Sequence, residues 1–337
     1  MLDFKQKLRN ETSVQCSGEI DIRRIQKLKE ENYYIINIPL DGDAPKQYIR
    51  AYFYYKNCPR KNNPLKWSGF FSKYGGKSYP HESVIEFMIN KIGDYLGLFM
   101  NEAKLVFVNQ QIRFLSKDFI KKGYKLIHGI EILAEYVEDR EFVDKVNQDR
   151  KTRRQLLTFQ EVENAIKHVY PYKQEEILES LIRLITFDAI VGNNDRHFYN
   201  WGLIGNIMSN KRQNVKFSPI YDSSRALLWN YTNEKINKMY SDFQHSYDPV
   251  NHYVKKSKPR FSFDGNPNAN HFELMEYLIG YNKTFKEVVK ALITVEKEND
   301  VICKLKKEVF LFFCEKRCTL IEAILRNRFE KLRSLIE

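Results

Sequence analysis

The sequence predicts an α+β protein with two lobes: a β-rich N-terminal lobe with one long helix, and a mostly helical C-terminal lobe that carries an inserted hairpin. Three observations support this prediction. The chain has 337 residues, and about 150 residues per domain gives two domains or lobes. Its first third is rich in strand-forming segments, and most of the remaining two thirds has apolar residues at helical spacing.

The first strands of the N-terminal lobe are predicted from their composition. Tyr33–Leu40 and Gln47–Tyr55 are rich in β-branched and aromatic residues, which favour strands. Residues 41–45, Asp-Gly-Asp-Ala-Pro, are typical of a turn between them. A third strand is predicted at Trp67–Tyr74, where two glycines follow.

One long helix completes the N-terminal lobe. Residues 80–98 carry apolar side chains at 3.6-residue spacing, and Gly97 marks the helix end. The segments Lys104–Asn109 and Gln111–Ser116 then predict a hairpin. We expect the boundary between the lobes within residues 116–123, which divides the chain into residues 1–117 and 118–337.

The C-terminal lobe is predicted to contain a buried central helix. Phe159–Val169 and Glu175–Val191 both have helical apolar spacing, and the second is apolar on nearly all sides, as a buried helix is. The strands Trp201–Ile204 and Val215–Tyr221 flank a polar turn and form the inserted hairpin. From about Phe272 the pattern predicts helices to the end of the chain.

Composition limits the environment and the partners. Lys plus Arg is 55 and Asp plus Glu is 43, a net charge of +12, which fits either polyanionic partners or a basic soluble surface. The N-terminus lacks the apolar segment of a signal peptide, and the sequence has no apolar run near the ~20 residues that span a bilayer. We therefore expect a cytoplasmic protein. Five cysteines without a Cys-x-x-Cys pair predict neither a disulfide framework nor a zinc site.

The strongest functional pattern is the polar segment Gly192–Asn200, Gly-Asn-Asn-Asp-Arg-His-Phe-Tyr-Asn, directly after the buried helix. Asp222 ends the second strand of the inserted hairpin, so the hairpin is expected to bring Asn200 and Asp222 together. Their amide and carboxylate oxygens suit Mg²⁺ with bound phosphates. Asp195 is then free to orient a hydroxyl, which is the arrangement of kinase phosphoryl transfer. The simpler alternative is that Asp195 and Asn200 serve as turn and capping residues.

A kinase also needs a cation for the nucleotide phosphates. Lys73 lies in the predicted strand before the long helix, and Glu82 and Glu86 lie on that helix as candidate partners. The turn at residues 40–46 could cap phosphates, but Gly42 is its single glycine, so a plain hairpin turn is an equal alternative. Lys73 could also be a solvated lysine at a sheet edge.

These segments resemble the HipA-like kinases, serine/threonine kinases with a bilobal fold related to protein kinases and phosphatidylinositol kinases. The resemblance covers about residues 40–228. Gly192–Asn200 is similar to the family's catalytic loop, Pro219–Asp222 to its metal-binding Tyr-Asp, and Glu86–Leu98 to the helix with the ion-pair glutamate. The resemblance therefore implies an ATP- and Mg²⁺-dependent protein kinase with a protein-kinase-like fold, able to phosphorylate itself.

The resemblance also implies roles for individual residues. Asp195 would be the catalytic aspartate, and Asn200 and His197 would belong to the catalytic set with it. The alternative for His197 is that it only braces the loop. Asn200 and Asp222 would coordinate Mg²⁺. Glu86, with Glu82 in reserve, would pair with Lys73. The remaining ATP-binding residues would be Gly42, Lys73, Lys117, Phe119 and Tyr221, with the backbone of residues 117–119 as the hinge that reads adenine.

Some features leave alternatives open. Pro39 stands where the family's phosphate loop usually has a modifiable serine, so regulation by that modification is not expected. The pattern Asp-Arg-x-x-x-Asn at residues 195–200 also resembles the catalytic loops of phosphatidylinositol kinases. A lipid kinase is therefore an alternative function. A third alternative is a nucleic-acid or partner-binding module with a vestigial site. The expected substrate is a serine or threonine of a protein. Because the family includes a secreted bacterial member, the resemblance also allows secretion of this chain by a route without a signal peptide, and a host protein as its substrate.

Two basic runs could contact an acidic partner. They are residues 150–154, Arg-Lys-Thr-Arg-Arg, and residues 255–260, Lys-Lys-Ser-Lys-Pro-Arg. The second run comes after Asp222, at the place where a kinase has its activation or substrate loop, so one hypothesis is that it presents substrate. A solvated surface is the alternative for both.

Overall fold

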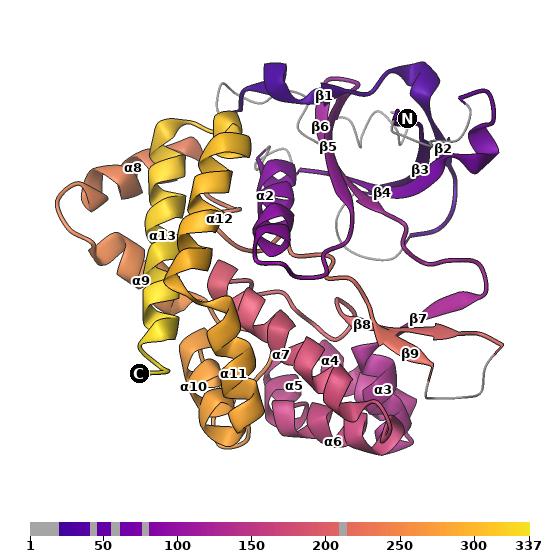
Figure 1. Ribbon diagram of the computed structural model, residues 1–337, viewed down its shortest axis with the longest axis vertical. Coiled ribbons are helices and arrows are strands. Elements are labelled where there is room, and N and C mark those ends of the chain that lie inside the picture. The colour runs from indigo at the N-terminus through magenta and orange to yellow at the C-terminus, as the bar shows by residue number, and fades with distance from the viewer. Residues whose placement is uncertain (1–19, 41–45, 55–60, 76–80, 209–213) are drawn as a thin grey trace.

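The computed structural model describes residues 20–40, 46–54, 61–75, 81–208 and 214–337. Figure 1 shows a curled sheet with one helix, α2, beside it, and a larger helical region below and to the left. The predicted α+β fold, with a β-rich N-terminal part and a helical C-terminal part, is confirmed.

The N-terminal sheet has six strands among the described residues, in the order β1-β5-β6-β4-β3-β2. Only the β1–β5 pair is parallel. Lys73 lies at the centre of this sheet, opposite Lys46 on one side and Phe114 on the other. The strands are β1 (Gln26–Lys27), β2 (Tyr33–Ile36), β3 (Lys46–Ala51), β4 (Ser68–Tyr74), β5 (Ala103–Val108) and β6 (Gln111–Lys117).

Helix α2 (Glu82–Tyr95) packs against β4, β5 and β6. Its apolar face is fully buried at Val84, Ile85, Met88, Ile89 and Ile92, in agreement with the predicted spacing. Gly97 follows the helix with a φ of +78°, which an L side chain rarely adopts. The predicted segment, residues 80–98, extends past this helix, which ends at Tyr95 and is followed by a turn at residues 96–97; residue 80 lies outside the described residues.

A second, smaller sheet has the order β7-β8-β9 among the described residues. Its strands are β7 (Tyr124–His128), β8 (Gly202–Asn206) and β9 (Val215–Phe217). The hairpin of β8 and β9 was predicted, although β9 ends four residues earlier than expected. Strand β7 was missed, because its Tyr-Lys-Leu-Ile-His sequence is too short to show an alternating pattern.

Helices make up the rest of the C-terminal part. Helix α7 runs through its centre (Figure 1), and its residues from Ile177 to Val191 are buried except at positions 179, 180 and 183. The helices are α3 (Gly129–Val137), α4 (Arg140–Gln148), α5 (Arg150–Leu156), α6 (Phe159–Val169), α7 (Gln174–Val191), α8 (Asn233–Phe243), α9 (Asp248–Lys256), α10 (His271–Tyr281), α11 (Lys283–Leu292), α12 (Val295–Glu308) and α13 (Glu315–Arg333).

Other predicted bounds also change. The strand expected at Tyr33–Leu40 ends at Ile36, and the one expected at Gln47–Tyr55 ends at Ala51. The lobe boundary at 117/118 remains an inference. It is supported by the strands on either side, since β6 belongs to the N-terminal sheet and β7 to the second sheet.

None of the helices in the described part of the chain combines the length and the apolar character that crossing a bilayer requires. Cys303, Cys314 and Cys318 are free thiols, and the other two cysteines lie outside the described residues.

Gly202 is required where β8 meets β7. A Cβ atom at this position would lie 2.3 Å from the backbone oxygen of Ile127, and a paired strand cannot easily move away. We expect Gly202→Ala to lower the free energy of unfolding by about 1–3 kcal/mol. The matched control is Gly280→Ala in α10, where a Cβ meets open space and stability should be unchanged or higher. Urea unfolding of both variants checks this, and equal stabilities would contradict it.

Candidate active site

The polar segment after α7 begins with a tight helix end. Gly192 has a φ of +75°, and the N–H groups of Gly192 and Asn193 both donate to the Asp188 oxygen at 2.8 and 2.9 Å. The left-handed conformation favours glycine. The chain therefore turns sharply out of the buried helix into the segment 192–200.

A buried ion pair holds this segment in place. The Arg196 guanidinium donates to both carboxylate oxygens of Asp188 at 2.9 and 3.0 Å, and both side chains are almost fully buried. Arg196 also donates to the backbone oxygens of Asn200 (2.9 Å) and Tyr221 (2.6 Å) and to the Ser223 hydroxyl. One side chain thus joins the loop to the residues around Asp222.

Sequence reasoning missed this role of Arg196. The observation that could have found it is Asp188, an acidic residue in an otherwise apolar helix. A buried carboxylate needs a cationic or hydrogen-bonding partner, and Arg196 is the first cation after it along the chain.

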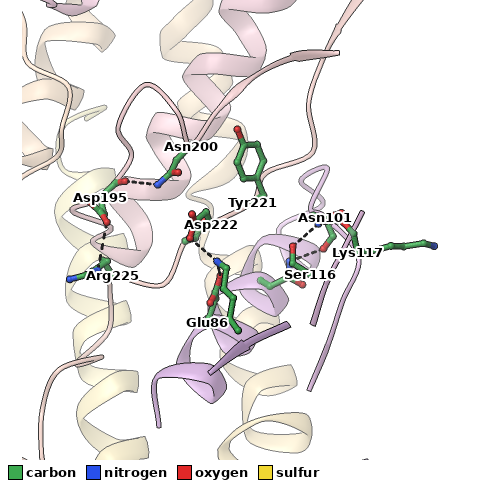
Figure 2. A network of polar contacts seen from close by, with 12 residues as sticks. Glu86, Asn101, Ser116, Lys117, Asp195, Asn200, Tyr221, Asp222 and Arg225 are labelled. Carbon is green, nitrogen blue, oxygen red and sulfur yellow. Dashed lines mark hydrogen bonds and ion pairs between the residues drawn. The ribbon is translucent and has the colours of Figure 1, made fainter. Parts of the chain in front are cut away.

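Asp195 and Asn200 are held by local hydrogen bonds. The Asn200 Nδ2 donates to the Asp195 backbone oxygen at 3.0 Å, and the Asp195 N–H donates to Asn193 Oδ1 at 3.2 Å. The Asn200 Oδ1 accepts no hydrogen bond from the described residues and could therefore bind a cation. Figure 2 shows Asn200 and Asp222 on neighbouring segments, which the Arg196 bridge joins.

His197 braces the loop. Its Nδ1 accepts a hydrogen bond from the Tyr199 N–H at 3.3 Å, so this nitrogen carries no proton. Burial lowers the pKa of His197, although the carboxylates of Asp195 and Asp222 oppose the change. The neutral His197 ring thus stabilises the loop through its contact with Tyr199, which fits the alternative that His197 only braces the loop.

Asp222 is fixed by contacts between the two parts of the chain. The segment before it pairs with the residues after α2: the Ile220 N–H donates to the Phe99 oxygen at 2.8 Å, and the Asn101 N–H donates to the Ile220 oxygen at 2.9 Å. Asp222 itself has a φ of +52°. Such backbone conformations in non-glycine residues concentrate at functional sites.

Lys73 lies between two carboxylates. Its Nζ is 2.6 Å from Glu86 Oε1 and 2.7 Å from Asp222 Oδ1. Lys73 comes from β4, Glu86 from α2, and Asp222 from the segment after β9, so the contact joins both parts of the chain (Figure 2). The structure pairs Lys73 with Glu86, which was the first choice among the two glutamates.

The charges of this group follow from burial and proximity. Burial raises the pKa of Glu86 to about 7, and the Lys73 ammonium opposes that rise. For Asp222, burial would raise the pKa, but the neighbouring basic groups, Lys73 first and then Arg196 and His197, together lower the pKa to about 2. Burial would lower the pKa of Lys73, but Asp222 and Glu86 together raise it. At neutral pH, Lys73 is therefore protonated and Asp222 is ionised.

The predicted hinge connects the two sheets. The Lys117 backbone is already bonded, since its N–H donates to the Glu102 oxygen and its oxygen accepts from Asn101 Nδ2 at 2.8 Å. The Lys117 side chain pairs with Glu102 and points away from the site (Figure 2). The Asp118 N–H donates to the Gly69 oxygen.

Two aromatic rings lie next to the hinge. The centroids of Phe119 and Tyr221 are 5.6 Å apart, and the Tyr221 hydroxyl donates to the Tyr199 oxygen at 2.9 Å. Tyr221 therefore links the predicted hinge to the segment 192–200. Gly42, the remaining predicted ATP-binding residue, lies outside the described residues.

The available oxygens fit Mg²⁺ as it is held on a nucleotide. The described residues contain no cluster of three or more His, Cys, Asp or Glu side chains that would bind a metal on their own. Asn200 Oδ1 and the second carboxylate oxygen of Asp222 accept no hydrogen bond from the described residues. Mg²⁺ is commonly bound by one or two such oxygens together with phosphates and waters.

The Asp195 carboxylate is held by two arginines that sequence reasoning did not single out for this contact. Arg260 Nη2 and Nε lie 2.5 and 3.2 Å from Asp195 Oδ1, and Arg225 Nε lies 3.6 Å from Oδ2. Arg260 is the last residue of the second basic run, so its charge was noted but its partner was not.

The first basic run is not a surface patch throughout, and the expectation of an exposed run is wrong for its last two members. Arg153 and Arg154 are each 5% exposed. Arg154 donates to the backbone oxygens of Pro259, Pro267 and Ala269. Its function is structural: it binds the loop that leads to Arg260.

Comparisons with known proteins agree with the fold. A family model described as the HipA-like C-terminal domain matches residues 41–297. The fold is similar to that of a Helicobacter pylori proinflammatory kinase, CtkA, with a TM-score of 0.65 and 17% sequence identity over 87% of this chain and 94% of that chain. No curated protein matched the sequence.

A second solved structure is HipA from Shewanella oneidensis MR-1, in a toxin–antitoxin complex with HipB and operator DNA. It matches with a TM-score of 0.49 and 12% identity, over 79% of this chain and 58% of that chain.

Proposed function

Because the chain belongs to the HipA-like family, whose domain model spans most of its length, we propose that it is an ATP- and Mg²⁺-dependent kinase that phosphorylates serine or threonine residues of proteins, including its own. The observation that carries the proposal is the contact of Lys73 with both Glu86 and Asp222. A strand lysine that pairs with a helix glutamate and approaches a metal-binding aspartate is the ATP-binding arrangement of protein kinases.

The nucleotide would extend from the hinge to the catalytic loop. Adenine would lie near the rings of Phe119 and Tyr221. Since the Lys117 N–H and the Asp118 N–H already donate to backbone oxygens, the Phe119 N–H is the donor proposed for adenine. The ammonium of Lys73 would then contact the α- and β-phosphates, while remaining paired with Glu86.

The reaction would be an in-line transfer. The acceptor hydroxyl oxygen forms a bond to the γ-phosphorus as the bond from that phosphorus to the β–γ bridging oxygen breaks, which releases ADP. The hydroxyl proton passes to the Asp195 carboxylate. Mg²⁺, held by Asn200 and Asp222, would neutralise charge on the phosphates. Arg196 would hold Asn200 and Asp222 in position, since it donates to the backbone oxygens of Asn200 and of Tyr221, the residue before Asp222.

The proposal is tested by transfer of labelled γ-phosphate from ATP to three acceptors in parallel: the protein itself, a generic basic protein and phosphatidylinositol vesicles. We expect Mg²⁺-dependent label on serine or threonine of the protein acceptors and none on the lipid. Label on the lipid alone would instead support a lipid kinase.

A reaction without any label would contradict the proposal. Salt-dependent DNA binding combined with the absence of label would support a binding module with a vestigial site. The control reaction uses EDTA, since loss of label in EDTA separates enzymatic transfer from nonspecific adsorption of the nucleotide.

A further inference from the structure

Asp195 is the proposed base, yet both of its oxygens are near guanidinium groups. Arg260 contacts Oδ1 from two nitrogens, and Arg225 lies 3.6 Å from Oδ2. Among the described residues, Asp195 is the only carboxylate that forms an ion pair with either arginine. A hydroxyl that binds to Asp195 must therefore compete with these cations.

The two arginines are anchored by other contacts. The Arg225 guanidinium lies 4.4 Å from the centroid of the Trp229 ring, and the Arg225 backbone oxygen accepts from the Asn194 N–H at 3.2 Å. The loop before Arg260 is bound twice, because the Ser257 hydroxyl donates to the Gly192 oxygen at 2.9 Å and buried Arg154 donates to the Pro259 oxygen. Both cations are thus positioned in advance.

Both guanidinium groups lie at the Asp195 carboxylate, which is proposed to receive the acceptor hydroxyl. In Figure 2, the hinge residue Lys117 lies on one side, Asp222 and Glu86 lie in the middle, and Asp195 lies beyond them with Arg225 below it. In this view Arg225 lies away from Lys117, at whose segment the nucleotide is proposed to bind. The exposed lysines of the same basic run, at positions 255, 256 and 258, extend the positive charge outward.

Displacement of a guanidinium from Asp195 has an energetic consequence. The side chains of Arg260 and Arg225 are 25% and 39% exposed, so each is partly desolvated. A partly buried cation that loses its carboxylate is destabilised unless another anion replaces it. An acidic group next to the acceptor hydroxyl would supply that anion.

We propose that Arg260 and Arg225 select protein acceptors with acidic residues beside the phosphorylated serine or threonine. Acceptor binding exchanges one partner for another: the hydroxyl takes the place of a guanidinium on Asp195, and the displaced guanidinium pairs with an acidic side chain of the acceptor. This proposal rests on the proposed kinase function and names its substrate class.

The test compares two synthetic peptides that differ only in charge. One has Asp and Glu on both sides of a single serine, and the other has Asn and Gln at the same positions. We expect the wild-type chain to phosphorylate the acidic peptide with a kcat/KM about 10- to 100-fold higher, because a hydrogen bond between charged groups contributes about 1.5–3 kcal/mol.

The variants are Arg260→Gln, Arg225→Gln and the double variant. Each single change should reduce the ratio of the two kcat/KM values, and the double variant should bring it near one. Arg260→Glu should reverse it, so that a peptide with lysines around the serine becomes the better acceptor. The matched control is Lys290→Gln, which removes one positive charge from an exposed position on α11 and should leave the ratio unchanged. Thermal melting verifies that each variant is folded.

Three results would overturn the proposal. An equal loss of transfer to both peptides in Arg260→Gln, together with slower ATP hydrolysis in the absence of peptide, would mean that Arg260 binds the γ-phosphate. An equal gain with both peptides would mean that it only blocks Asp195. A wild-type ratio near one, or no transfer to either peptide, would exclude acidic acceptors. Failure of the kinase function itself is distinct, since the protein would then transfer no label to any acceptor, including itself.

Discussion

Replacement of Asp195 by alanine should reduce phosphoryl transfer by about 10³-fold or more. Asp195 is the carboxylate proposed to receive the hydroxyl proton, and its backbone is held by Asn193 and Asn200. The substitution removes the base but keeps those backbone hydrogen bonds, so the loop should retain its conformation. The measurement is the initial rate of label transfer from ATP at saturating nucleotide.

Two controls make the result specific. Asp300→Ala removes a carboxylate from α12 that pairs with Lys304 on the surface and should leave the rate unchanged. Nucleotide affinity of Asp195→Ala should stay close to that of the wild type, since Asp195 makes no contact with Lys73 or Asp222. A near-wild-type rate in Asp195→Ala would show that another group accepts the proton.

The Asp222 side chain should be equally important, but for a different reason. Its carboxylate approaches Lys73 and is proposed to hold Mg²⁺ with Asn200. We expect Asp222→Ala to reduce transfer by about 10³-fold or more and to abolish the effect of Mg²⁺ on nucleotide affinity. Titration of the nucleotide with and without Mg²⁺ measures the second effect directly.

The backbone at this position requires a second variant. The φ of Asp222 is +52°, a conformation that is unfavourable for alanine and better tolerated by asparagine. Asp222→Asn therefore keeps the shape and the backbone while it removes the charge, and it should lose transfer to a similar extent. If Asp222→Asn kept both the wild-type rate and the wild-type Mg²⁺ dependence, Asp222 would not be a metal ligand.

Much of the fold could be predicted because its determinants are local. The apolar residues of α2 and α7 recur at helical spacing, and their burial confirms that each packs as the pattern indicates. Strands β4, β5 and β6 were recognisable from runs of β-branched and aromatic residues. By contrast, β7 was missed because a five-residue strand pairs according to its place beside β8 rather than its composition.

The site was predicted in part for the same reason. The order of polar residues from Gly192 to Asn200 is fixed by the chain, and so is the position of Asp222 after the hairpin. By contrast, the burial and the contacts of the arginine side chains could not be predicted from their order along the chain. Arg153 and Arg154 belong to a run that looks exposed, yet both side chains are buried. Arg154 donates to the Pro259 backbone oxygen, and Arg153 donates to the Asn147 backbone oxygen.

The sequence by itself determined the α+β class, the central buried helix and the polar segment from Gly192 to Asn200 that follows it. These depend on side-chain type and spacing within a few helical turns or one hairpin. Only the tertiary structure decided which charged groups meet: Lys73 with Asp222, 149 residues apart, and Arg260 with Asp195, 65 residues apart. The physical reason is that an ion pair depends on distance in space, and packing of the two parts of the chain sets that distance.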